Sequence, residues 1–235
     1  MNDKISIIIP VLNDATTLGP TLVSLQPLRQ LGHEVLVVDG GSRDGTVSIA
    51  RKYADRVLIS GAGRALQMNT GADSSAHPVL LFLHANTLLP IDADALIHAA
   101  LSPQSSIWGY FAIRFAHKRW VFRLLERCID LWTRISGVAT GSQAIFVSKQ
   151  FFEKVRYYDG LPLLEDVALS KKLLRYGWPQ RVRTPVIIST AKWEAKGVVR
   201  AILQIWIIRT AYFFGVHPDA LAQRYQADIK EKDGS

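Results

Sequence analysis

The segment that most constrains the fold of this chain covers residues 35–46 and reads VLVVDGGSRDGT. Four apolar residues end at Asp39, two glycines follow, and a second acid, Asp44, precedes a helical pattern. This order predicts a buried parallel strand, a tight turn and the start of a helix. Ligands of open α/β sheets bind at the carboxyl ends of the strands, so Asp39 is expected beside a ligand such as a nucleotide.

Short apolar runs alternate with helical patterns through the first 90 residues. The runs predict buried strands at residues 5–11, 34–38, 57–59 and 79–83. Helical spacing of apolar residues predicts helices at 15–31, 46–53 and 64–76, with Asp44 or Ser42 capping the second of them. This alternation predicts an α/β fold with a mostly parallel, doubly wound sheet flanked by helices.

The second half of the chain is less regular. Helices are expected at 91–101, 118–135 and 165–176, and strands at 107–115, 143–147, 181–183 and 186–188. Gly177 is expected to cap the helix before it. A very apolar C-terminal helix is expected at 197–214, where two arginines argue against a membrane span of about 20 apolar residues. Packing on the sheet and lying at a membrane interface both stay open for this helix.

Length and cysteine content favour one domain in a reducing compartment. The chain has 235 residues, 49% of them hydrophobic, which suffices for a single large core. We expect this domain to span residues 1–225, with a polar tail at 226–235. One cysteine excludes an internal disulfide framework and cysteine zinc clusters. The N-terminus runs directly into a strand pattern, so a cytoplasmic protein without a signal peptide is expected.

Charge is distributed unevenly along the chain. The net charge is +8, and residues 111–235 hold 21 of the 28 basic but only 11 of the 20 acidic side chains. This asymmetry indicates an anionic partner, either phosphate groups or an anionic membrane face. A solvated basic surface is the alternative. Nucleic acid is not expected, because no recognition helix or RNP-like aromatic pattern is present.

Several motifs together resemble the family 2 glycosyltransferases of GT-A fold. They are IIIPVLND at 7–14, VVDGGSRDGT at 37–46, FLHANT at 82–87 and LEDV at 164–167. The segments GRALQMNTGA at 63–72 and KWEAKG at 192–197 resemble a small bacterial branch of that family. The resemblance covers residues 5–225 and implies a nucleotide-sugar-binding half at 1–110 and an acceptor half at 111–225. It implies inverting transfer of a sugar from a UDP- or GDP-linked donor to an acceptor hydroxyl, in the synthesis of a cell-envelope polysaccharide or glycolipid.

The resemblance also assigns residues to the donor. Pro10, Asn13 and Asp14 end the first strand and face the base and ribose, although the family usually has Glu at the position of Asp14. Asp39 accepts hydrogen bonds from the base or ribose, with turn capping as its alternative role. Arg64 and Gln67 begin a helix along the donor, and a cation at a helix N-terminus suits phosphate. An exposed structural arginine is the alternative for Arg64.

The segment from His84 to Asn86 departs from the family pattern. Most members have an Asp-x-Asp element here that binds a divalent metal, Mn or Mg, against the diphosphate. The branch keeps His first and Asp third, but this chain has the neutral Asn86 in third place. Asparagine is an oxygen ligand that supplies no charge to hold a cation. Metal binding is therefore weakened, absent or supplied by other groups, and His84 is either a ligand or a hydrogen-bonding partner of phosphate.

The remaining assignments concern catalysis and the acceptor. The resemblance implies that Asp166 deprotonates the acceptor hydroxyl while Glu165 orients or binds the acceptor. The alternative is that both acids only stabilise a helix N-terminus. Gln143 is expected at the donor sugar or acceptor. Three residues near the C-terminus are expected at the leaving diphosphate or the acceptor, namely Lys192, Trp193 and Arg200.

Two other functions stay open beside transfer. A nucleotidyltransferase would carry a Gly-x-Gly-x-Arg segment after its first strand, which this chain lacks. A binding protein that keeps the fold without turnover would be consistent with Asn86. If the chain is a transferase, the basic second half and the apolar helices at 118–135 and 197–214 suggest a lipid-linked acceptor and peripheral association with the inner face of a membrane.

Overall fold

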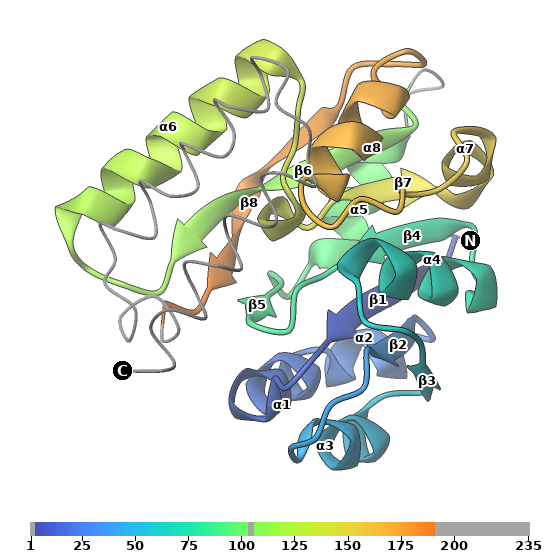
Figure 1. The fold of residues 1–235 in the computed structure, drawn as a ribbon. Helices are drawn as coiled ribbons and strands as arrows, with labels where there is room; N and C mark the ends of the chain where they lie inside the picture. Colours follow the sequence, from blue (N-terminus) through green and yellow to red (C-terminus); the bar gives the residue numbers. More distant parts are fainter. Residues whose placement is uncertain (1–2, 103–105, 191–235) are drawn as a thin grey trace.

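The computed structural model describes residues 3–102 and 106–190 and contains one eight-stranded sheet with helices on both sides (Figure 1). The strands, in chain order, are β1 (Ile5–Val11), β2 (Glu34–Asp39), β3 (Arg56–Ile59), β4 (Val79–Phe82), β5 (Thr87–Leu88), β6 (Trp108–Phe115), β7 (Phe146–Ser148) and β8 (Gln180–Ile188). The helices are α1 (Ala15–Ser24), α2 (Gln26–Gln30), α3 (Thr46–Tyr53), α4 (Arg64–Ser74), α5 (Ala93–Leu101), α6 (Trp120–Ser136), the 3-10 helix η1 (Gly141–Gln143), α7 (Lys149–Lys154) and α8 (Glu165–Leu173). The strand order is β3-β2-β1-β4-β7-β6-β8-β5.

The first four strands of this order form a parallel half-sheet with both faces covered. β1 pairs in parallel with β2 and β4, and β2 pairs in parallel with β3. All seven residues of β1 are buried, and they alternate between two cores. Ile7 and Ile9 pack with α1, whereas Ile8 packs with α4, where a Cβ added at Gly71 would clash with the side chain of Ile8. The prediction of a mostly parallel sheet flanked by helices is confirmed.

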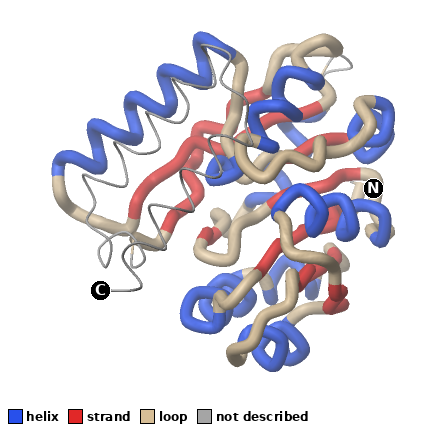
Figure 2. Tube along the Cα trace, viewed as in Figure 1, coloured by secondary structure: helices blue, strands red, loops and turns tan. Residues whose placement is uncertain are grey.

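The second half of the sheet is mixed. β7 runs antiparallel to β4 and β6, β6 runs parallel to β8, and β5 closes the edge antiparallel to β8. Figure 2 shows α6 as the longest described helix, lying across this part of the sheet. The ring of Phe122 on α6 packs 5.3 Å from that of Phe115 on β6. The register of β1 and β2 brings Val11 beside Asp39, so these two strands end together.

Several predicted boundaries are wrong for local reasons. The helix expected at 15–31 divides at Leu25, and the strand expected at 143–147 is η1 followed by a strand that begins at Phe146. The segments 181–183 and 186–188 form one strand, β8. α8 ends at Leu173, so Gly177 does not cap it. The N-cap residue of α3 is Gly45; Asp44 just before it accepts the N–H of Thr46, whereas Ser42 accepts the N–H of Asn13.

β5 and α7 were not predicted, since two residues and six residues are too short to produce a clear period. The apolar helix expected at 197–214 and the polar tail lie outside the described residues. Within the described part of the chain, no helix has the length and apolarity that crossing a membrane requires.

Candidate active site

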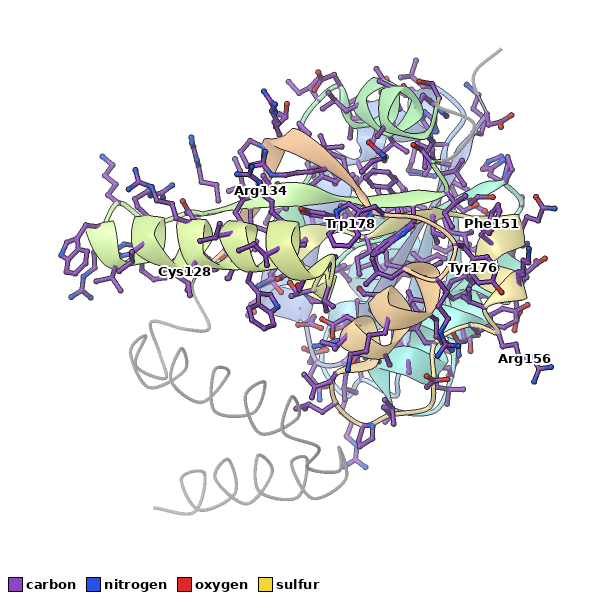
Figure 3. The ribbon with its side chains drawn as sticks, turned by 90° about the horizontal axis from the view of Figure 1, so that it is seen from above. Cys128, Arg134, Phe151, Arg156, Tyr176 and Trp178 are labelled. Carbon is purple, nitrogen blue, oxygen red and sulfur yellow. The ribbon has the colours of Figure 1, made fainter. Side chains whose placement is uncertain are left out.

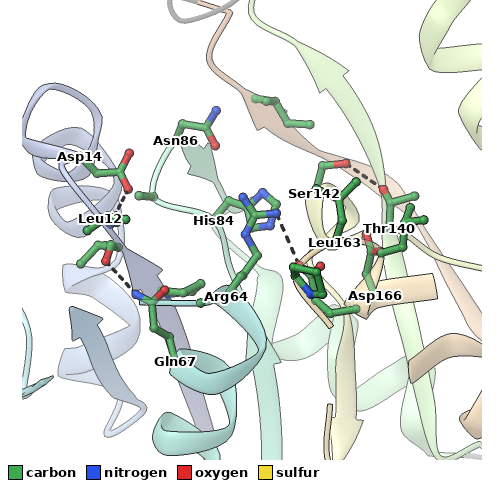
Figure 4. A pocket seen from close by; sticks show the side chains of 18 of the residues that line it. Leu12, Asp14, Arg64, Gln67, His84, Asn86, Thr140, Ser142, Leu163 and Asp166 are labelled. Atoms are coloured by element: carbon green, nitrogen blue, oxygen red, sulfur yellow. Dashed lines mark hydrogen bonds and ion pairs between the residues drawn. The ribbon is translucent and has the colours of Figure 1, made fainter. Parts of the chain in front are cut away.

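A cleft of about 630 Å³ opens at the carboxyl ends of β1 and β4 (Figure 4). Its walls come from the end of β1, the start of α4, the loop after β4, the loop at residues 140–142 and the start of α8. Eight of the predicted site residues line it, namely Pro10, Asp14, Arg64, Gln67, His84, Asn86, Glu165 and Asp166. The lining also contains the apolar side chains of Phe115, Ile129, Leu163 and Ile188, and Figure 4 shows Leu163 close to Ser142 and Asp166.

Asp166 is held at the cleft by two backbone amides. Gly141 donates its N–H to Oδ2 at 2.6 Å, and Val167 donates its N–H to Oδ1 at 2.8 Å. The chain enters α8 through Leu164, whose φ of 64° makes a sharp turn, so both acids fall in the first helical turn. The partial positive charge of a helix N-terminus favours carboxylates there. These contacts fix the direction of the Asp166 carboxylate.

Glu165 is buried, with 5% of its surface exposed, and it lies 3.5 Å from the guanidinium of Arg64. Burial and then repulsion from Asp166 raise the pKa of Glu165, and Arg64 only partly opposes this shift. Tyr158 lies buried nearby, and burial together with these two carboxylates raises the pKa of its hydroxyl well above the ordinary value. The Arg64 guanidinium itself stays half exposed at the N-terminus of α4, so it can reach an anion in the cleft.

His84 follows β4 and packs against the 140–142 loop. A Cβ added at Gly141 would lie 2.8 Å from Nε2 of His84, so a glycine is needed for this close approach. Among the described residues, Nε2 has no hydrogen-bonding partner. Burial, and then the charge of Arg64, lower the pKa of His84 to about 3. The imidazole is therefore neutral at physiological pH.

Asp39 lies behind the cleft rather than in its lining. Its side chain is 2% exposed, and Oδ2 accepts the N–H groups of Gly41 and Ser42 at 2.9 Å each. Gly41 has a φ of 98°, which explains the glycine at this turn. The alternative role, turn capping, is thus present. Oδ1 is also buried, and no described group donates to it.

Asn13 and Asp14 shape the loop that joins β1 to α1. Asn13 adopts a φ of 53°, and its Oδ1 accepts the N–H of Arg43 at 2.9 Å. Asp14 lines the cleft, and its Oδ2 accepts the N–H of Leu12 at 3.1 Å. The Asn13 side chain thus braces the loop after β2, whereas Asp14 borders the space that a donor would occupy.

The two glutamines among the predicted residues make internal contacts. Nε2 of Gln67 donates to the carbonyl oxygens of Val11 and Val38 at 2.7 and 2.8 Å, which ties the ends of β1 and β2 together. Gln143 is fully buried, and its Oε1 accepts from the N–H of Thr140 at 2.9 Å. Gln143 lies outside the cleft lining and its Nε2 is buried without a described partner, and its predicted contact with donor or acceptor stays a prediction.

The residues at the end of β4 do not fit the metal site that the resemblance implies. Asn86 is neutral, its Nδ2 donates to the carbonyl of Ser189 at 3.4 Å, and its Oδ1 accepts from Thr87 at 3.4 Å. Nε2 of His84 is buried against Gly141. Across residues 3–102 and 106–190, no three His, Cys, Asp or Glu side chains converge as metal ligands. The other predicted cations and aromatic, Lys192, Trp193 and Arg200, lie outside the described residues.

Sequence reasoning missed three features of the site. They are the amide of Gly141 that holds Asp166, the buried hydroxyl of Tyr158 beneath the acids, and the pairing of Arg64 with Glu165. The Gly141–Gln143 segment could be identified as a loop, but nothing in its composition indicated which acid it contacts. The Arg64–Glu165 pair joins residues 101 apart in the chain, a separation that local patterns do not reveal.

Comparisons with known proteins point to one family of enzymes. The family model described as Glycosyl transferase family 2 matches residues 6–134. A PGL/p-HBAD biosynthesis glycosyltransferase of Mycobacterium bovis is 35% identical over 127 residues, which cover 49% of this chain and 49% of the relative. Glycosyltransferase AglE of Haloferax volcanii is 39% identical over 88 residues, covering 34% of this chain and 29% of AglE. The matched part of the chain thus spans about half the length of the mycobacterial relative and 29% of the length of AglE.

Two solved structures share the fold. S. aureus TarS 1-349 in complex with UDP-GlcNAc superposes with a TM-score of 0.62 at 18% identity, over 79% of this chain and 58% of TarS 1-349. The mannosyltransferase PcManGT from Pyrobaculum calidifontis, in complex with GDP-Man and Mn2+, gives a TM-score of 0.63 at 18% identity. That alignment covers 90% of this chain and 61% of PcManGT.

Proposed function

This chain belongs to glycosyltransferase family 2, and we propose that it transfers a sugar from a nucleoside diphosphate donor to an acceptor hydroxyl with inversion at C1. The observation that carries the proposal is the anchored Asp166 carboxylate, which shares one cleft with Arg64 and His84 at the carboxyl ends of β1 and β4. This is the edge of an α/β sheet at which nucleotides bind.

Transfer needs a base on one side of C1 and charge stabilisation on the other. We assign the base to Asp166, which takes the hydroxyl proton as the acceptor oxygen bonds to C1. The bond from C1 to the diphosphate oxygen breaks, and its electron pair leaves with the nucleoside diphosphate. Arg64 stabilises the charge that develops on this leaving group. The pair that Arg64 makes with Glu165 holds the guanidinium at the cleft before the donor arrives.

The donor is a UDP- or GDP-linked sugar in this proposal. Asp39 and the end of β1 at Pro10 and Asp14 bind the base and ribose, and the buried Oδ1 of Asp39 supports this assignment because it is an acceptor without a described donor. The donor-bound relatives, TarS with UDP-GlcNAc and PcManGT with GDP-Man, support a nucleotide sugar and leave the base open.

The acceptor is a hydroxyl of a lipid-linked molecule in this proposal, and the protein works peripherally at the inner face of a membrane. Support comes from the apolar side chains of Phe115, Ile129, Leu163 and Ile188, which line the same cleft as the catalytic acids. An amphipathic acceptor matches a cleft lined by both polar and apolar groups.

Metal chemistry is not assigned a step here, because the described ligands around Asn86 do not fit a divalent cation. PcManGT was solved with Mn2+, so the two proteins are expected to differ at this point. The neutral Asn86 also favours a second candidate, a binding protein of the same fold without turnover.

Release of nucleoside diphosphate tests the proposal. Wild type is incubated with UDP- and GDP-sugars, with Mn2+ or with EDTA, beside the variants Asp166→Asn and Asn86→Asp. If wild type releases nucleoside diphosphate and Asp166→Asn does not, the result supports transfer chemistry. Without an acceptor, this release reports transfer of the sugar to water. The hypothesis of a binding protein is supported if donors bind to wild type without being turned over, and if Asn86→Asp with Mn2+ restores release of nucleoside diphosphate.

A further inference from the structure

We infer that the outer face of α6 is a docking surface for a lipid bilayer with anionic headgroups. The outer face is defined here by Trp120, Leu124, Cys128, Leu131 and Ile135. This inference gives the membrane association proposed above a specific location. Its link to the acceptor depends on the proposed function, whereas docking itself can be measured without it.

The outer face is apolar and exposed along four turns of one helix. Spacings of four, four, three and four residues place its members on one side of α6. Trp120 is 73% exposed, Ile135 70%, Leu131 55% and Leu124 51%, and Cys128 is also exposed. The opposite side of the helix, with Phe122 and Leu125, is buried on the sheet. A contiguous apolar stripe of this kind marks an interaction surface.

The exposed polar side chains next to this stripe are all basic. Arg127 and Arg134 lie along it, and Lys118 and Arg119 precede the helix. Figure 3 shows Cys128 and Arg134 on α6, where the helix extends from the body of the protein. An apolar helix face flanked by basic residues and tryptophan is the pattern of interfacial helices on anionic membranes.

The two acids of α6 do not reduce this positive charge. Glu126 accepts hydrogen bonds from the guanidinium of Arg123 at 2.9 Å and the N–H of Phe115 at 2.7 Å. Asp130 accepts from Nε of Arg181 at 2.6 Å. Both acids are therefore paired with arginines other than those beside the outer face. The positive charge beside the outer face favours an anionic partner.

Charge also argues against protein occupants of the outer face. A symmetric pair of copies would bring the Arg127 and Arg134 rows of two α6 helices close together. The apolar segment at 197–214 of this chain carries Arg200 and Arg209, so it offers no negative charge to these rows. An anionic bilayer offers acyl chains to the apolar stripe and negatively charged headgroups to the basic row.

α6 connects the outer face to the cleft. Its residue Ile129 is partly buried on the opposite side of the helix and lines the cleft together with Phe115 and Ile188. A bilayer on the outer face would therefore lie against the same helix that forms part of the cleft wall. The acceptor class that fits is an amphipathic lipid with a hydroxyl on its head group.

Cys128, the single cysteine of the chain, makes the outer face directly measurable. Cys128 is labelled with an environment-sensitive fluorophore, and vesicles of phosphatidylcholine with phosphatidylglycerol are added at low salt. We expect a blue shift, quenching by lipids brominated in their acyl chains, and weakening of both at high salt. Unlabelled protein should sediment with the same vesicles, and less with phosphatidylcholine alone.

Variants distinguish binding through the outer face from nonspecific binding to vesicles. Leu124→Glu with Leu131→Glu should abolish sedimentation with anionic vesicles, whereas the control Ile59→Glu with Ile91→Glu changes two exposed apolar residues away from α6 and should not. Arg127→Gln and Arg134→Gln should each weaken partitioning about fivefold, from roughly 1 kcal/mol per basic residue at an anionic surface. Circular dichroism confirms that each variant is folded.

Three results would overturn the inference. They are no sedimentation of wild type at low salt, a label that already reports an apolar environment and ignores vesicles, and a dimer in lipid-free ultracentrifugation that the Leu124→Glu, Leu131→Glu variant breaks. The second result would indicate that another part of this chain covers the outer face. The third would indicate that a second copy of the chain covers it. Failure of docking leaves nucleoside diphosphate release intact, so it is distinguishable from failure of the proposed function.

Discussion

The backbone N–H of Gly141 lies 2.6 Å from Oδ2 of Asp166, and this hydrogen bond joins the loop before β7 to the first turn of α8. The contact holds the carboxylate beside the loop that packs against His84, after the end of β4. It also makes the position of Asp166 depend on a loop whose glycine is required by the neighbouring His84. The 140–142 loop thus contacts both the proposed base, Asp166, and His84 on the donor side of the cleft.

The first prediction concerns Asp166 itself. Asp166→Asn keeps the size of the side chain but cannot accept the hydroxyl proton, so kcat should fall by about 10²–10⁴-fold. Donor affinity measured by calorimetry should stay unchanged. Asp159→Asn is the matched control, because Asp159 is an exposed acid that pairs with Lys172 outside the cleft lining. A parallel loss of donor affinity and turnover in Asp166→Asn would contradict the role of base.

Gly141→Ala is expected to uncouple the two sides of the cleft. The new Cβ would lie 2.8 Å from Nε2 of His84 and 3.7 Å from Oδ2 of Asp166, so the loop or the imidazole must shift. Overpacking of this kind costs about 1–3 kcal/mol of stability, and turnover should fall further than stability accounts for. Gly160→Ala serves as the control, since nothing lies within 4 Å of its added Cβ. Equal turnover in both variants would show that the close approach is not needed.

His84 should make stability depend on pH. Its pKa is about 3 in the folded protein and about 6.5 in the unfolded chain, so between these values the unfolded state binds more protons. The free energy of unfolding should therefore fall as pH drops from 6.5 toward 3, by at most about 1.4 kcal/mol per pH unit. Denaturant unfolding at several pH values checks this slope, which His84→Asn should flatten. A wild-type slope unaffected by His84→Asn would contradict the burial argument.

The sequence predicted the parallel half of the sheet well because residues 5–11, 34–38 and 79–83 are buried on both faces and read as continuous apolar runs. It also indicated the edge of the sheet where the cleft lies. Gln67 and Gln143 show where such reasoning ends. Both are polar residues within motifs, yet both satisfy backbone groups inside the protein. A motif gives the residue type, whereas its direction depends on packing between segments distant in the chain.

Arg64 should contribute to diphosphate binding specifically. Its guanidinium is the cation that the described residues place in the cleft lining, and a hydrogen bond to a charged group contributes about 1.5–3 kcal/mol. Arg64→Ala should therefore weaken binding of UDP or GDP about 10–100-fold and leave the parent nucleoside unaffected. Titrations with EDTA present should give the same ratio. The control is Arg56→Ala, which removes an exposed arginine of β3. Equal weakening of nucleoside and diphosphate would place Arg64 away from the phosphates.

The last prediction uses the asymmetry of the Asp39 carboxylate. In Asp39→Asn, the amide oxygen can still accept the N–H groups of Gly41 and Ser42, while the amide nitrogen replaces Oδ1, the buried oxygen without a described donor. The turn should survive, but an acceptor becomes a donor. Nucleotide and nucleoside affinity should both fall about 10–100-fold, as expected for loss of a hydrogen bond to a charged group.

Stability distinguishes this effect from damage to the loop. Asp44→Asn is the matched control, because Oδ1 and Oδ2 of Asp44 already accept the backbone N–H groups of Thr46 and Ala15. Asp44→Asn should lower the melting temperature with little change in nucleoside affinity, whereas Asp39→Asn should do the reverse. If Asp39→Asn destabilises the fold and binds the nucleoside normally, then Asp39 only caps the turn, and the base and ribose bind elsewhere along the ends of β1 and β2.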